Sequence, residues 1–116
     1  MKYDPSNALA RIDNDKGLLV MLIGVFIKEC PKYIEKLQTA CDDQNMSALG
    51  DAAHNVKGAS AAIGFDACTK LAESLEVSCR QSGVKSISSF QDSTDNLINV
   101  LNGGSALLTE WVDANQ

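Results

Sequence analysis

Apolar side chains recur at intervals of three and four residues along most of the 116-residue chain. The clearest run follows Asp15 and places one or two apolar residues in every helical turn: Leu19, Leu22, Ile23, Phe26, Cys30, Tyr33, Ile34 and Leu37. This period is that of an amphipathic α-helix. Because the run keeps its phase through Pro31, we predict one helix from about residue 15 to residue 43, kinked at the proline, with two separate helices as the alternative.

Four further segments repeat the helical period between turn residues: 5–12, 46–63, 65–81 and 87–111. Asp4 and Pro5 are typical of a helix start. The third of these segments is expected to stop near Gly83, and Gly103 and Gly104 predict a bend or break in the last one. Since no alternation typical of strands appears, we predict an all-α fold. It is an up-and-down antiparallel four-helix bundle with a short N-terminal cap helix, forming a single domain over residues 1–116.

Charge, apolar runs and cysteine spacing exclude several kinds of partner. A net charge of −5 at pH 7 provides no strongly basic surface for nucleic acid. The ten-residue apolar run 18–27 is shorter than the roughly 20 residues that span a bilayer, so we expect no membrane insertion and a cytoplasmic location. The cysteines lack the spacing of metal-binding pairs and are expected to be reduced, and no metal site is predicted. They are Cys30, Cys41, Cys68 and Cys79.

His54 is the only histidine, and it belongs to the helix predicted over 46–63. The apolar and small residues of that helix gather on one side: Leu49, Ala52, Ala53, Val56, Ala59, Ser60 and Ile63. At about 100° per residue, His54 lies roughly 160° from the centre of this side, so its ring is expected to point into solvent. Its neighbours on the outer face are Ser47, Gly50, Asp51, Lys57, Gly58 and Ala61.

Two glycines flank His54 at one turn on either side, Gly50 and Gly58. Each costs about 1 kcal/mol relative to alanine inside a helix. We interpret both as leaving the imidazole uncovered. An exposed histidine alone is typical of an ordinary surface position, but these glycines and Lys57 favour a functional one.

The chemistry of an exposed imidazole fits covalent phosphoryl transfer. With an unperturbed pKa of about 6.5, an imidazole offers a nucleophilic nitrogen near pH 7. It can attack an acyl phosphate and hold the phosphoryl group, which divides one transfer into two. Lys57, one turn from His54, can stabilise the phosphoryl oxygens. Asp51 is interpreted as a solubilising residue rather than a general base, because a carboxylate would repel the phosphoryl group.

The stretch from Ala53 to Gly64, AHNVKGASAAIG, resembles the signature of the histidine-phosphotransfer (HPt) family. In that signature a small residue precedes the histidine, and an apolar residue, lysine, glycine, small residues and a closing glycine follow. Val56 stands where leucine is commoner. The resemblance extends over residues 5–82 and includes a downstream helix marked by Cys68, Leu71, Ala72, Leu75 and Glu76.

The resemblance implies a phosphorelay carrier rather than an enzyme, with His54 as phosphoacceptor, Lys57 stabilising charge and Gly58 giving access. The implied partners are response-regulator receiver domains and a hybrid sensor histidine kinase. In that family the receiver supplies Mg²⁺ and the acidic pocket, so the chain needs no cofactor of its own. The glycines of 58–64 lack the lysine and preceding strand of a phosphate-binding loop, so no ATP site is predicted.

A second apolar line on the long helix is a candidate docking surface: Leu18, Met21 and Val25. Either the N-terminal helix covers this line, or the line is an exposed partner patch beside His54. With the outer-face residues Ser47, Gly50, Asp51 and Ala61, it makes up the predicted partner-binding set.

Two other functions remain open at this point. The first hypothesis is a phosphorelay carrier, which is usually monomeric. The second is the phosphoacceptor domain of a histidine kinase; if that domain is the kinase's dimerisation domain, it would form a stable dimer. A non-catalytic helical adaptor is the third possibility. It predicts that His54→Gln leaves partner signalling intact.

Overall fold

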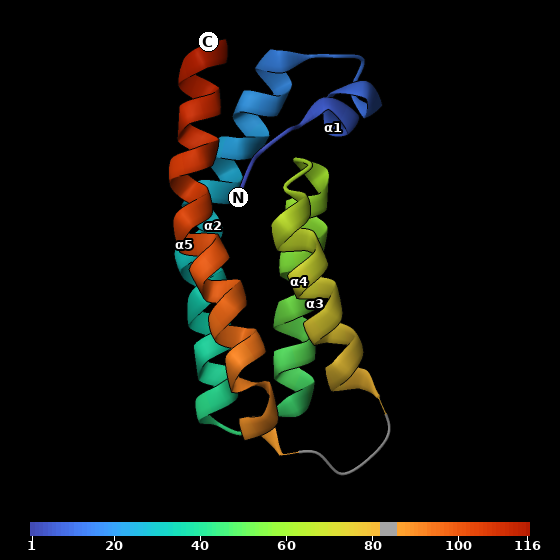
Figure 1. Cartoon of the computed structure of the whole chain (residues 1–116), viewed down its shortest axis with the longest axis vertical. Coiled ribbons are helices and arrows are strands. Elements are labelled where there is room, and N and C mark those ends of the chain that lie inside the picture. The colour runs from blue at the N-terminus through green and yellow to red at the C-terminus, as the bar shows by residue number, and fades with distance from the viewer. Residues whose placement is uncertain (82–85) are drawn as a thin grey trace.

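The computed structural model describes residues 1–81 and 86–116, and the helix end expected near Gly83 lies outside them. The described residues form five α-helices and one 3₁₀ turn (Figure 1). In chain order these elements are α1 (Ser6–Arg11), α2 (Lys16–Asp42), α3 (Met46–Ala62), α4 (Asp66–Arg80), η1 (Ile87–Phe90) and α5 (Gln91–Asn115). The predicted all-α class is confirmed.

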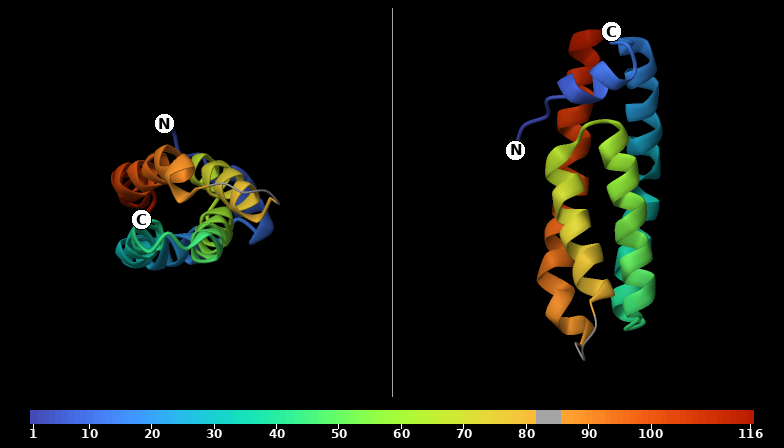
Figure 2. Two further views of the ribbon diagram at one scale, coloured as in Figure 1. Left: turned by 90° about the horizontal axis from the view of Figure 1, so that it is seen from below. Right: turned by 90° about the vertical axis from the view of Figure 1, so that its right-hand side faces the viewer.

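The long helices α2, α3, α4 and α5 run antiparallel to their neighbours in an elongated bundle of 47 × 22 × 20 Å. Helix α3 packs against α2 and α4, and α5 packs against the same two helices. Viewed end-on, α3 and α5 therefore occupy opposite corners (Figure 2). The predicted four-helix bundle with an N-terminal cap helix is confirmed.

Helices α2 and α3 begin close to the positions expected from the sequence, and each has a side-chain N-cap. The Asp15 side chain accepts a hydrogen bond from the Leu18 backbone N–H at 3.0 Å, and Asn45 accepts one from Ala48 at 3.0 Å. At the other end of α3, Gly64 has a φ of +69°, the left-handed conformation that ends a helix at little cost for glycine. Helix α2 continues through Pro31, which confirms a single helix.

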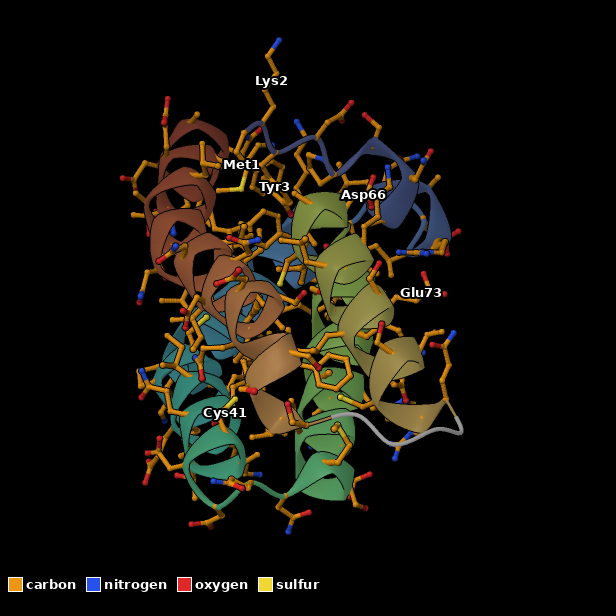
Figure 3. All side chains as sticks on the ribbon, turned by 60° about the horizontal axis from the view of Figure 1, so that its bottom comes forward. Met1, Lys2, Tyr3, Cys41, Asp66 and Glu73 are labelled. Carbon is orange, nitrogen blue, oxygen red and sulfur yellow. The ribbon has the colours of Figure 1, made fainter. Side chains whose placement is uncertain are left out.

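The N-terminal segment, which includes the cap helix α1, is fastened to the C-terminal end of α3 by two side chains that donate to backbone carbonyl groups. Arg11 Nη2 donates to the Ala61 carbonyl at 2.7 Å, and Tyr3 Oη donates to the Ile63 carbonyl at 2.6 Å. Figure 3 shows Tyr3 at the end of the bundle where α4 begins at Asp66. The N-terminal segment therefore closes this end of the bundle and satisfies backbone groups there.

The core consists of the predicted apolar stripes. Leu19, Ile23, Leu37, Leu49 and Val56 are fully buried between the helices. All four cysteines are free thiols, as expected, and three of them are buried. None of the helices in the described part of the chain is long and apolar enough to cross a membrane.

A bend or break was expected at Gly103 and Gly104, and the break is wrong, because α5 runs unbroken from Gln91 to Asn115. Gly104 is buried against the Phe65 ring, and a Cβ there would lie 2.6 Å from Phe65 Cζ and also overlap Cε2. Phe65 in turn packs edge-on against Tyr3 and Phe26. Burial of this aromatic group offsets the local cost of glycine in the helix.

Candidate functional site

His54 projects from the middle of α3 into solvent, with 60% of its side chain exposed. The predicted orientation away from the core is confirmed. Its Nδ1 lies 2.8 Å from Oε2 of Glu76 on the neighbouring helix α4, whose side chain is only 12% exposed. The imidazole is therefore held in place by a carboxylate of an adjacent helix.

Glu76 holds Lys57 as well as His54. Lys57 Nζ lies 2.7 Å from Glu76 Oε1, on the same flank as the imidazole, as the helical phase predicted. In the unphosphorylated protein the ammonium is therefore paired with a carboxylate. The Lys57 hydrogen bond, together with the nearby His54, lowers the pKa of Glu76 although partial burial opposes the shift.

The lowered pKa of Glu76 predicts an acid-sensitive contribution to stability. Folding favours the ionised form of the Glu76 carboxyl group. The stabilisation that follows is fully present above the ordinary carboxyl pKa of about 4.3, and it is lost as the pH falls through the lowered pKa of the folded state. We expect the unfolding temperature of wild type to exceed that of Glu76→Gln near pH 6. The difference should shrink between about pH 5 and pH 3. A difference that stays constant over this range in thermal melts would contradict the assignment.

Arg80, one turn after Glu76 on α4, is a second cation at the site that the sequence analysis missed. Its Nη2 lies 2.8 Å from Asp51 Oδ1 and 3.6 Å from Glu76 Oε2. Asp51 therefore has a specific partner and is not only a solubilising residue. The four-residue spacing from Glu76 was the one available signal, since it places Arg80 on the same face of α4.

The two flanking glycines have different environments. Gly58 is exposed, and a Cβ added there would meet no atom within 4 Å, so the space beside the ring on that side is open. Gly50 is buried, and its predicted place on the open outer face is wrong. A Cβ there would lie 3.2 Å from Arg80 Nη1 and 3.3 Å from Cys79 Cβ, so Gly50 makes room for the arginine rather than for the imidazole.

The second apolar line of α2 is exposed and not covered by α1. Leu18, Met21 and Val25 are 37%, 65% and 56% exposed. From the turn between α2 and α3, a rise of 1.5 Å per residue places Val25 about 13 Å further along the bundle than His54. The patch and the imidazole are therefore separated along the bundle axis.

The other predicted partner-binding residues differ in accessibility. Ser47 and Asp51 are exposed at the start and middle of α3. Ala61 is half-buried, and its carbonyl is occupied by Arg11. Among residues 1–81 and 86–116, no group of three His, Cys, Asp or Glu side chains is placed to hold a metal ion.

The site therefore lies on an antiparallel helical bundle and presents an exposed histidine beside a lysine and an arginine. The Hpt domain family matches residues 21–113, and the chain belongs to that family. Members of the family are phosphocarriers rather than true enzymes, and membership supports a phosphotransfer role in two-component signalling.

The fold is also similar to a solved structure. The crystal structure of the HPT domain of a sensor hybrid histidine kinase from Shewanella superposes with a TM-score of 0.84 and is 15% identical in sequence. The match covers 97% of this chain and 94% of the other. At this identity the similarity concerns the fold alone. No match was found among curated proteins.

Proposed function

We propose that the chain accepts a phosphoryl group on Nε2 of His54 from an aspartyl phosphate of one receiver domain and passes it to the aspartate of another. The observation that carries this proposal is the Glu76 contact to Nδ1 at 2.8 Å. A carboxylate can only accept, so a neutral imidazole must carry its proton on Nδ1. Its lone pair is then on Nε2, which has no hydrogen-bond partner among the described residues.

The chemical step follows from this tautomer. Nε2 attacks phosphorus, the bond between phosphorus and the aspartyl oxygen breaks, and the carboxylate leaves with the receiver. The Nδ1 proton stays in the hydrogen bond to Glu76. This hydrogen bond favours the form of the phosphorylated imidazole that keeps its proton on Nδ1. In the onward transfer the aspartate carboxylate of the second receiver attacks phosphorus, the bond between Nε2 and phosphorus breaks, and His54 leaves as a neutral imidazole. Lys57 neutralises charge on the phosphoryl oxygens.

The remaining components belong to the partners in this proposal. Receiver domains supply Mg²⁺ for transfer, and a hybrid sensor histidine kinase supplies the phosphoryl group, because the proposed role is that of a carrier that does not itself use ATP. We propose a monomer acting in the cytoplasm, with residues 1–116 as one domain. A receiver of ordinary size has a radius of gyration of about 13 Å and could contact both His54 and the patch of Leu18, Met21 and Val25.

The proposal is tested by mixing the chain with receiver domains that carry labelled aspartyl phosphate. We expect the label to appear on the chain in an acid-labile, base-stable form, as a phosphohistidine requires. A second receiver added afterwards should remove the label. If the chain stays unlabelled with a panel of receivers and with a small phosphoryl donor, the proposed function is wrong.

Gly58→Ala is expected to separate stability from transfer. The added methyl group meets no atom within 4 Å and removes the helix cost of glycine, so the free energy of unfolding should rise by about 1 kcal/mol. Transfer from a receiver should slow by about tenfold or more, because the methyl group occupies space that the docked partner needs. Urea unfolding and single-turnover labelling measure the two effects.

Gly103→Ala on α5 is the matched control, because this glycine is also exposed and lies on the helix opposite α3. It should raise stability similarly and leave transfer unchanged. Equal transfer rates for Gly58→Ala and wild type would show that the open space beside His54 is not used.

A further inference from the structure

One carboxylate at the site lies within reach of three cationic or hydrogen-bonding side chains. Glu76 Oε1 pairs with Lys57 at 2.7 Å, and Oε2 contacts His54 Nδ1 at 2.8 Å. Arg80 Nη2 lies 3.6 Å from Oε2, beyond hydrogen-bond distance, while its contact with Asp51 is 2.8 Å. The site therefore contains one cation that is hydrogen-bonded to Glu76 and another that forms only a longer ion pair with it.

When His54 is phosphorylated, the phosphoryl group competes with the Glu76 carboxylate for the Lys57 ammonium. A phosphoryl group on Nε2 adds nearly two negative charges and attracts the ammonium of Lys57. If Lys57 turns to the phosphoryl oxygens, Glu76 loses its closest counter-ion while it is only 12% exposed. The carboxylate would then be repelled by the phosphoryl group, and its hold on Nδ1 would weaken.

We propose that Arg80 is a positioning residue that replaces Lys57 at Glu76 while His54 carries the phosphoryl group, an inference that rests on the proposed function. The guanidinium must approach Glu76 Oε2 by about 0.7 Å to reach ordinary hydrogen-bond distance from its present 3.6 Å. It can do so without leaving Asp51, because its five N–H donors can serve two acceptors at once. Glu76 thus stays ionised and keeps its contact with Nδ1.

Helix α3 contributes the features that hold Arg80 in this position. Asp51 binds one edge of the guanidinium, and Gly50 removes the side-chain atom that would lie 3.2 Å from Nη1 and 3.3 Å from Cζ. Alanine at position 50 would be the better helix former, so glycine costs local stability. The arrangement explains why a buried glycine lies one turn before His54.

A double-mutant cycle between Arg80 and Glu76 tests the inference. Labelling of His54 by phosphoramidate, whose ammonia leaves as the phosphoryl group moves to Nε2, measures the site without a protein partner. We expect Arg80→Gln to slow labelling about fivefold in the wild-type background. In the Glu76→Gln background, which has no carboxylate to neutralise, Arg80→Gln should change the rate by less than about twofold. An equal slowing in both backgrounds, or none in either, would overturn the inference.

Three further variants keep the test independent of folding. Arg80→Lys should restore most of the rate, whereas Lys70→Gln, which removes an exposed cation from the same helix, should have no effect. Gly50→Ala keeps the arginine but displaces it, and should also slow labelling only when Glu76 is present. Thermal melts identify any variant that is unfolded. If wild-type protein takes no label from phosphoramidate or receivers, the proposed function fails; if it is labelled and the cycle is additive, only the role of Arg80 fails.

Discussion

His54→Gln is expected to abolish labelling of the chain by phosphorylated receivers, a loss of about 10³-fold or more. Glutamine has a size and polarity similar to histidine, but its amide nitrogen is not a nucleophile. The fold should be unaffected, because 60% of the His54 side chain is exposed. The label is measured after a single encounter with the receiver, and the fold by circular dichroism and thermal melting.

The neighbouring variant Asn55→Ala provides the control, since Asn55 is exposed on the same helix and has no role in the proposed step. It should be labelled like wild type. Persistent label on His54→Gln would assign the phosphoryl group to another side chain. The phosphorelay function and the adaptor alternative are therefore distinguished by one pair of variants.

Gly104→Ala should have the largest effect on stability among the variants considered, lowering the free energy of unfolding by about 2 kcal/mol. The new Cβ would lie 2.6 Å from Phe65 Cζ, and the ring is 1% exposed within a cluster that includes Tyr3 and Phe26, so it has little room to move. Overpacking of this kind costs about 1 to 3 kcal/mol or more, against a gain of about 1 kcal/mol in helix propensity. The unfolding temperature should fall by about 5 to 10 °C.

Gly103→Ala is again the matched comparison, because its Cβ would lie 3.8 Å from Met1 Cε, an ordinary contact. The same substitution at adjacent positions should therefore stabilise the chain at 103 and destabilise it at 104. Urea unfolding of both variants measures the difference. Similar free energies for the two would mean that the Phe65 ring moves aside at little cost.

Features that depend on local sequence were predicted well. The spacing of apolar residues sets which face of a helix is buried, so the all-α bundle, the unbroken passage of α2 through Pro31 and the outward direction of His54 followed from helical phase alone. The helix starts at Asp15 and Asn45 also depend on local sequence alone, because a capping side chain accepts a hydrogen bond from a backbone N–H only three residues away.

Features that depend on contacts between helices were missed or left open. Nothing local shows that the Phe65 ring packs against Gly104, so the two adjacent glycines predicted a bend or break. Gly50 was assigned to His54 because the arginine that covers it comes from α4, thirty residues later in the chain. Whether α1 covered Met21 could not be settled before the position of that helix was known.

The amino-acid sequence by itself determined the helices, their buried faces and the exposed histidine, because periodicity and capping act within a few turns of one helix. Only the tertiary structure decided that Glu76 joins His54 to Lys57 and that Arg80 lies behind it, held by Asp51. These contacts depend on the register of α4 against α3. That register is set by packing of the whole core, which acts between residues distant in sequence.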